Sequence, residues 1–315
     1  MVGELFRMSE PTQAPALSET RTEPPPDSAV EVRWERLLPA EYRSRVAALP
    51  VAFLPLGTVE WHGEHNALGL DSLKAHALCI RAAQSAGGGV VHPPLYGGMG
   101  GLDRPATVVM EGEHSWENLL LRPWLEKLCL EFHRQGFLAI LMVTGHYGHN
   151  QQITVRETAA RMSERLQIPV LGTPEYWLAQ DEGYLGDHAG IGETSLLWHL
   201  EPDLVRIERI HGDPDYGKTD TIFRGASPEL GARYASRIVE RLAALAADMP
   251  HWDRETLERF IHAERALVSA QVRGWRDTGA WAAWARPHRG ELAHYGECLV
   301  QRRFAEIEAL ASLLL

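Results

Sequence analysis

The chain has 315 residues, which is enough for one large domain or two ordinary ones. Hydrophobic residues make up 45% of it and charged residues 23%, a balance that excludes disordered and fibrous proteins and is typical of a globular one. The 31 lysine and arginine residues stand against 42 acidic ones, which gives a formal net charge of −11. Because no basic cluster stands out either, neither nucleic acid nor a membrane is an expected partner.

The first 30 residues are rich in proline, serine, threonine and glutamate, with few large apolar groups, which predicts a flexible leader. The N-terminus lacks the basic and apolar regions of a signal peptide, and no apolar run approaches the ~18 residues of a membrane span. We therefore expect a cytoplasmic protein. Cys79, Cys129 and Cys298 are widely spaced and odd in number, which favours reduced core cysteines.

From residue 51 onward, apolar runs alternate with stretches of helical apolar spacing. The runs predict strands at 51–56, 90–91, 137–143 and 168–171, and the stretches between them predict helices at 71–86, 115–134 and 151–166. Strands without polar alternation are typical of a parallel sheet covered by helices on both faces, so the fold class is α/β. Three further helices are predicted at 228–247, 253–273 and 298–314. We divide the chain into the leader (1–30), an α/β domain (31–248) and a helical C-terminal extension (249–315).

The densest polar segment, residues 54–71, directly follows the first predicted strand and contains Glu60, His62 and Asp71. In extended backbone, residues two apart point the same way, so Glu60 and His62 can converge on one point. Carboxylate and imidazole together suit zinc, manganese or iron, and an aspartate such as Asp71 can bridge two such ions. The alternative is a solvated loop in which acids and histidines happen to cluster.

Two later segments carry similar side chains. The predicted strand 137–143 leads directly into TGHYGHN, which places His146 at the carboxyl edge of the same sheet, and Gly145 and Gly148 permit close approach of the backbone to a ligand. The segment GDHAGIGETS, residues 186–195, adds His188 and Glu193. Glu193 is equally compatible with the first turn of a helix, where the helix dipole favours an acid.

Taken together, PLGTVEWHGEHNALGLD, TGHYGHN and DHAGIGETS resemble the three ordered motifs of the creatininase (creatinine amidohydrolase) family. The resemblance extends from about residue 45 to about residue 245 and leaves out the leader and the extension. It implies a three-layer α/β/α sandwich with a mostly parallel sheet and a homo-oligomer that is commonly hexameric. It also implies a dinuclear zinc or manganese site, with iron as a further option, that hydrolyses small amides.

The resemblance also assigns roles to individual residues. Glu60 and His146 match ligands of one ion, His62 matches a ligand of the other, and Asp71 matches the bridge. Glu193 matches the remaining ligand of the second ion and is also predicted, with His188, to be a catalytic residue. The residue matched to handling the proton in the reaction is His188, which Asp187 is a candidate to orient.

Three departures from the family pattern limit what the resemblance implies. Gly148 stands where creatininase itself has a glutamate, Thr144 replaces an asparagine, and Ile191 replaces a frequent glutamate. Creatinine is therefore not the expected substrate. We expect a metal-activated water to attack an amide carbon of a small molecule, at a C–N bond other than an ordinary peptide bond, while His188 gives a proton to the leaving nitrogen.

Other activities remain open at this level. Relatives in the family suggest a formamide, a peptide precursor or a C–C bond of a cyclic keto-sugar as the substrate, and the three departures also fit a metal-binding subunit without turnover. Tyr147, Trp177 and Tyr184 are candidates to wall a substrate pocket, or else ordinary core residues. Nucleotide binding is less favoured, because no glycine-rich phosphate loop follows any predicted strand.

Overall fold

The computed structural model describes residues 30–99, 106–108, 110–111, 119–212, 225–278 and 287–315. The predicted leader, residues 1–30, lies outside this part of the chain except for its last residue. Within the described residues, the four strands are β1 (Val51–Leu56), β2 (Val90–Val91), β3 (Ala139–Thr144) and β4 (Val170–Pro174). All neighbouring strands are parallel, in the order β2-β1-β3-β4, which confirms the predicted parallel sheet.

The main helices of the described residues are α1 (Pro39–Ala48), α2 (Leu70–Ser85), α3 (Leu121–Arg134), α4 (His149–Leu166), α5 (Ile191–Leu200), α7 (Pro228–Asp248), α8 (Arg254–Thr278), α10 (Tyr295–Val300) and α11 (Phe304–Leu310). The predicted helix 115–134 starts only at Leu121, and residues 115–118 lie outside the described part. None of these helices is both long and apolar enough to cross a lipid bilayer.

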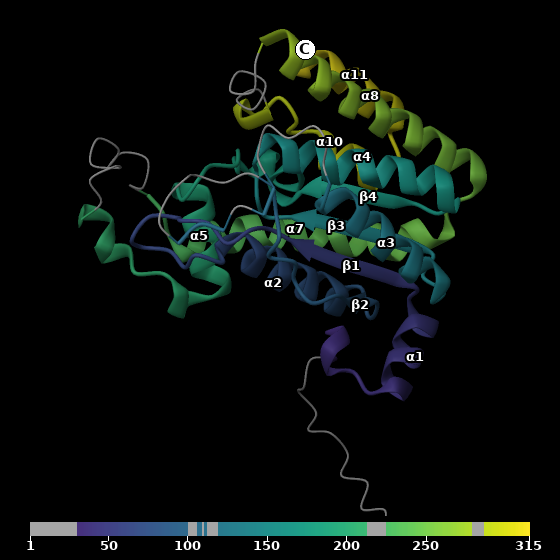
Figure 1. Ribbon diagram of the computed structural model, residues 1–315, viewed down its shortest axis with the longest axis horizontal. Helices are drawn as coiled ribbons and strands as arrows, with labels where there is room; N and C mark the ends of the chain where they lie inside the picture. The colour runs from purple at the N-terminus through teal and green to yellow at the C-terminus, as the bar shows by residue number, and fades with distance from the viewer. Residues whose placement is uncertain (1–29, 100–105, 109, 112–118, 213–224, 279–286) are drawn as a thin grey trace, which may run out of the picture.

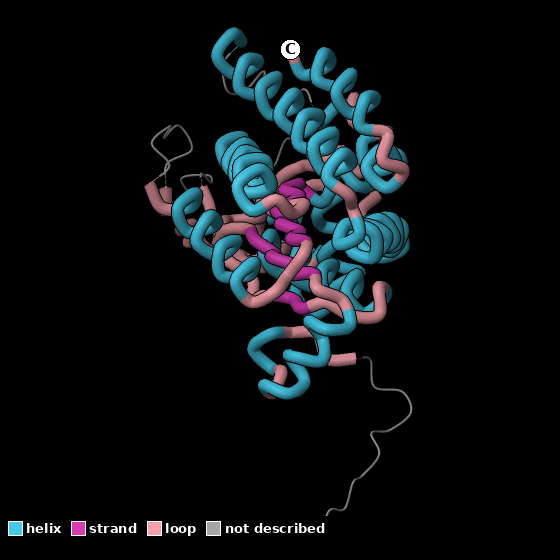
Figure 2. The backbone as a smooth tube through the Cα atoms, turned by 90° about the vertical axis from the view of Figure 1, so that its right-hand side faces the viewer, coloured by secondary structure: helices cyan, strands magenta, loops and turns pink. Residues whose placement is uncertain are grey.

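Helices cover both faces of the sheet, as the sandwich prediction requires (Figures 1 and 2). Every residue of β1 is buried, and successive side chains point to opposite faces. Phe53 packs into the core with α2 and α7, whereas Leu54 packs into a second core with α3 and α4. The apolar run without polar alternation is thus explained by a central strand that touches apolar side chains on both sides.

The C-terminal extension packs against α4 at the β4 side of the sheet, while α1 lies at the opposite edge near β2 (Figure 1). The prediction of one continuous helix over 298–314 is wrong. Arg302 has a left-handed backbone (φ 56°), and the amide of Arg303 donates to the carbonyl of Cys298 at 2.8 Å, which closes α10 before α11 begins. The chain then ends in a 3₁₀ turn at Ala311–Leu314.

Candidate metal centre

The predicted site residues lie at the carboxyl ends of β1 and β3 and in the first turns of two helices. The loop after β1 carries Glu60 and His62, and His146 follows β3 by two residues. Asp71 and Glu193 occupy the first turns of α2 and α5, where the positive end of the helix dipole favours a carboxylate. Elements far apart in the sequence thereby meet at one sheet edge, as expected for an α/β fold.

Two glycines allow this close approach. A Cβ added at Gly57 would lie 2.5 Å from the Cβ of Asp71, and one added at Gly145 would lie 2.1 Å from the carbonyl oxygen of Asp71. Both distances are far inside van der Waals contact, so no larger residue fits at either position without movement of α2. The glycines at the ends of β1 and β3 therefore set how near Asp71 comes to the two strands.

The five predicted ligands converge, and each is between 0 and 6% exposed. Nδ1 of His146 lies 3.1 Å from Oε2 of Glu60 and 3.1 Å from Oδ2 of Asp71. Nε2 of His62 lies 3.1 Å from Oδ1 of Asp71 and 3.8 Å from Oε2 of Glu193. Asp71 thus offers one oxygen to each of two clusters, Glu60–Asp71–His146 and His62–Asp71–Glu193, and each cluster could hold one ion.

The histidine rings are oriented by backbone carbonyl groups. Nδ1 of His62 contacts the carbonyl oxygen of Glu60 at 3.0 Å, and Nε2 of His146 contacts that of Met99 at 3.0 Å. Since a carbonyl oxygen only accepts, these nitrogens donate to it, and the other ring nitrogen of each histidine faces the carboxylates. Such an orientation is typical of metal-binding histidines.

The donor set fits a cation. Nε2 of His62 and Oδ1 of Asp71 are buried and lie 3.1 Å apart, and in the described part of the chain neither makes a hydrogen bond of regular geometry. Burial by itself lowers the pKa of His62, but the negative charges of Asp71 and Glu193 outweigh it and raise the pKa to about 9. Burial by itself raises the pKa of Glu60, but the charge of His146 outweighs it and lowers the pKa to about 2. The site therefore stabilises positive charge strongly.

His188 stands beside these clusters and is partly exposed. Its ring centroid lies 4.5 Å from that of His62, and its Nε2 contacts the carbonyl oxygen of Trp61 at 2.9 Å. Burial and the positive charge of His62 lower the pKa of His188 to about 4, which favours the neutral ring. With the proton on Nε2, Nδ1 is the atom able to accept another.

Two neighbours of the site hold the 186–195 segment in place, and one of them, Asp187, acts differently from its sequence interpretation. Asp187 accepts hydrogen bonds from the amides of Gly190, Gly192 and Glu193, so it holds the first turn of α5 rather than the ring of His188. Nε2 of His65, which lies in the loop after β1, contacts the carbonyl oxygen of Ala189 at 3.2 Å. Both side chains therefore fasten the 186–195 segment to its surroundings.

Sequence reasoning missed a buried polar group behind Glu193. Lys74, one turn after Asp71 on α2, contacts Glu193 and lies 3.1 Å from Oε1 of Glu175, the residue that directly follows β4. The hydroxyl of Tyr147 donates to Glu175 at 2.6 Å. The i, i+3 spacing from Asp71 was a usable signal for Lys74, because residues three apart share a helix face.

The aromatic candidates for pocket walls are buried instead. Tyr147 and Tyr184 touch through their hydroxyl groups at 2.5 Å within the same polar group. Trp177 packs against the guanidinium of Arg156, with 4.2 Å from the carbon Cζ to the ring centroid. These contacts place all three in the core.

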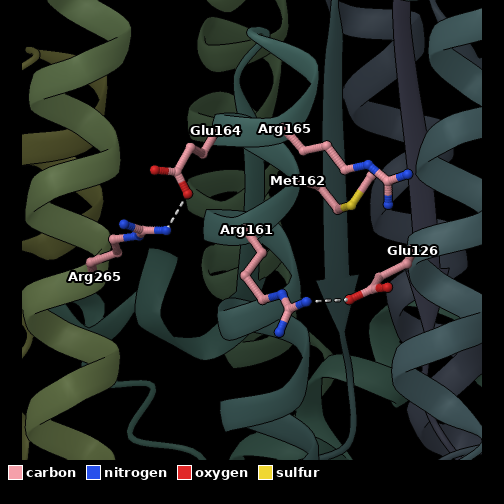
Figure 3. Close-up of a pocket in the computed structure, with 6 residues that line it drawn as sticks. All are labelled: Glu126, Arg161, Met162, Glu164, Arg165 and Arg265. Atoms are coloured by element: carbon pink, nitrogen blue, oxygen red, sulfur yellow. Dashed lines mark hydrogen bonds and ion pairs between the residues drawn. The ribbon is translucent and has the colours of Figure 1, made fainter.

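A surface hollow away from the metal ligands is shown in Figure 3. It lies near the C-terminal end of α4, and its side chains come from α3, α4 and α8: Glu126, Arg161, Met162, Glu164, Arg165 and Arg265. Arg161 pairs with Glu126 at 3.5 Å and Arg265 pairs with Glu164. Exposed, mutually paired charges without a catalytic group beside them do not resemble a substrate site.

Comparison with known proteins gives a consistent result. The family model described as creatininase (creatinine amidohydrolase) matches residues 35–246. A creatinine amidohydrolase of Pseudomonas putida is 30% identical over 210 residues, which are 58% of this chain and 75% of that enzyme. A mycofactocin precursor peptide peptidase of Mycobacterium ulcerans (strain Agy99) is 28% identical over 170 residues, which are 51% of this chain and 62% of that peptidase.

Solved structures give the same fold. One described as "Creatininase Mn" has a TM-score of 0.54 and 28% identity, and covers 70% of this chain and 99% of its own. A creatininase mutant of the Zn-Zn type has a TM-score of 0.54 and 26% identity, and covers 70% of this chain and 98% of its own. The part of this chain that these structures do not match is large enough to include the helices that follow residue 246.

Proposed function

Because the chain belongs to the creatininase family, we propose that this hydrolase is metal-dependent and cleaves the C–N bond of a small amide at a dinuclear centre. One observation carries the proposal: Asp71 is shared between two buried clusters, each of which offers three ligand atoms within reach of one another. Zinc and manganese suit carboxylate and imidazole ligands, and the solved relatives include a Zn-Zn form and a Mn form.

The chain's own residues divide the work. Glu60, Asp71 and His146 would hold one ion, and His62, Asp71 and Glu193 would hold the other. The ions would supply Lewis acidity, which polarises a carbonyl group and lowers the pKa of a water molecule. His188, fixed through Nε2 on the carbonyl of Trp61, would use Nδ1 to move a proton to the leaving nitrogen.

The substrate is proposed by chemical class. Creatinine itself is not favoured, because Gly148 stands where creatininase has a glutamate, and an added Cβ there would lie 2.5 Å from Nε2 of His146. A peptide amide is the second candidate, since the relatives include two mycofactocin precursor peptide peptidases. On the family resemblance alone, we also propose a homo-oligomer, and the expectation of a cytoplasmic protein stays a prediction.

Metal content tests the dinuclear centre. We expect elemental analysis of gently purified protein to give about two equivalents of divalent metal per chain. Asp71→Asn should lose both, because the bridge serves both clusters. Glu64→Gln, an exposed acid in the same loop, is the matched control and should keep the full content. Wild-type protein that binds no metal after reconstitution would contradict the proposal, as would an Asp71→Asn variant that keeps both equivalents.

Turnover tests the role of His188. A panel of cyclic amides, formamides and short peptides should identify a substrate for the metal-loaded chain. His188→Gln should then lower kcat by about 10²–10⁴-fold while metal content stays unchanged. A variant with full turnover would remove His188 from the mechanism, and hydrolysis of peptides alone would favour the second candidate.

A further inference from the structure

Lys74 is a buried lysine beside the candidate metal centre. Its side chain is 0% exposed, and Nζ donates to the hydroxyl of Tyr147 at 2.8 Å. Nζ also lies 3.1 Å from Oε1 of Glu175 and is in closer contact with Oε1 of Glu193. Because an ammonium group is costly to bury without such partners, these two acids account for its presence in the core.

Lys74 contacts one of the two carboxylate oxygens of Glu193. Oε1 of Glu193 accepts from Lys74, while Oε2 accepts from the amide of Ala189 at 2.8 Å and lies 3.8 Å from Nε2 of His62. Glu193 belongs to only one of the two clusters, His62–Asp71–Glu193. The positive charge of Lys74 therefore contacts Glu193, a ligand of one ion position. It does not contact Glu60 or His146, which belong only to the other position.

We propose that Lys74 is a positioning residue that makes the two metal positions unequal: it leaves a single oxygen of Glu193 for the His62 position, and its charge weakens the binding of a dication there. This inference rests on the proposed dinuclear centre. It follows that the position of Glu60, Asp71 and His146 fills first and the position of His62, Asp71 and Glu193 fills second.

The charge of Lys74 should affect metal binding more than its hydrogen bond, which helps to orient Glu193, does. Lys74 helps to orient Glu193, but the amide of Ala189 and the first turn of α5 already hold that carboxylate. We therefore expect Glu193 to keep its orientation when the hydrogen bond from Lys74 is lost. A unit charge next to a ligand of a buried dication changes its binding constant by about tenfold or more, even at a protein-like dielectric constant.

The test is a calorimetric titration of metal-depleted protein with Mn²⁺ alone, at pH 8. The wild-type chain should show two binding steps that differ by about tenfold or more. Lys74→Met removes the charge and keeps a side chain of similar length, so its second step should tighten by about tenfold or more and the gap should narrow.

A second variant should shift the same step in the opposite direction. Glu175→Gln removes a negative charge from the other side of Lys74, and pH 8 lies above the pKa of about 7 to which burial raises Glu175. Its second step should weaken. Misfolding cannot tighten binding in one variant and weaken it in the other. Arg156→Met, which deletes an equally buried cation outside both clusters, is the matched control and should leave both steps unchanged.

Each outcome separates this inference from the proposed function. A wild-type chain that binds no Mn²⁺ would refute the dinuclear centre itself. Two equal steps in the wild type, or a second step of Lys74→Met that is unchanged or weaker, would overturn the role of Lys74 and leave the dinuclear centre standing. If Lys74→Met does not fold, Glu175→Gln decides, and an unchanged or tighter second step in that variant would overturn the inference.

Discussion

Among the described residues, one lysine and one arginine, Lys74 and Arg156, are fully buried, and their surroundings differ. Lys74 lies behind the candidate metal centre against Glu175 and Glu193. Arg156, on α4, pairs with Glu264 of α8 at 2.7 Å, away from that centre. Both are charges that a core tolerates only with close partners.

The surroundings of the two cations differ in whether each nearby hydrogen-bond acceptor already has a donor. Around Arg156 both acceptor oxygens are used, and we call this group closed: Glu264 accepts from Tyr295 at 3.0 Å and from Arg156 at 2.7 Å, and the guanidinium stacks on Trp177. Around Lys74 the group stays open, because Oε2 of Glu175 has no hydrogen-bond partner among the described residues, and Oε2 of Glu193 also faces His62 at 3.8 Å. A closed group can join parts of a fold, here α4 to the extension, whereas leftover acceptors next to a buried cation point to a ligand that is still to bind.

The largest expected effect comes from breaking the closed group. Arg156→Met leaves Glu264 buried without its counter-charge, so the free energy of unfolding should fall by about 3–5 kcal/mol in denaturant titrations. Metal content of the folded fraction should not change. The double variant Arg156→Met with Glu264→Leu removes both charges and should recover much of the loss. A cost below about 1 kcal/mol for the single variant would show that the extension does not depend on this pair.

A smaller effect is expected from a substitution beside His146, one of the candidate metal ligands. In Gly148→Ala, the new Cβ would lie 2.5 Å from Nε2 of His146, so the ring must turn away from the carbonyl of Met99. We expect metal affinity to fall by about 10–100-fold at the position that uses His146, measured by titration of metal-depleted protein.

Gly183→Ala is the control for that substitution. Gly183 has a φ of 86° and open space around it, so an alanine there costs backbone strain without touching a ligand. It should lower stability and leave metal affinity as it is. Equal losses of affinity in the two variants would mean that general loosening of the fold, rather than displacement of His146, weakens the site.

Much of the α/β core and the convergence of the five acids and histidines could be predicted from sequence, because both follow from apolar runs that end in polar residues. β1 was predicted at its observed bounds, and parallel strands that end at one edge must bring their following loops together. The break after α10 could not be predicted, since the left-handed turn at Arg302 interrupts a continuous helical pattern without a glycine or proline.

The open group was missed for physical reasons that differ between its members. A lysine on a helix is almost always exposed, and only the neighbouring acids, which come from distant segments, make burial of Lys74 possible. Glu175 was missed because the apolar run stops at Leu171, whereas β4 continues through Gly172 and Thr173 to Pro174. With the strand end placed three residues later, β4 would have been a third strand followed by a candidate polar residue, Glu175.

The smallest effect expected is the coupling between the two cations. A chain of aromatic rings lies between them: Tyr147 is 4.7 Å from Tyr176, which is 6.4 Å from Trp177, the ring under Arg156. Since Lys74 and Arg156 share no hydrogen-bond partner among the described residues, a double-mutant cycle of their methionine variants in metal-free protein should give an interaction energy below about 0.5 kcal/mol. A larger value would mean that the aromatic rings transmit strain, and that the extension influences the metal centre through them.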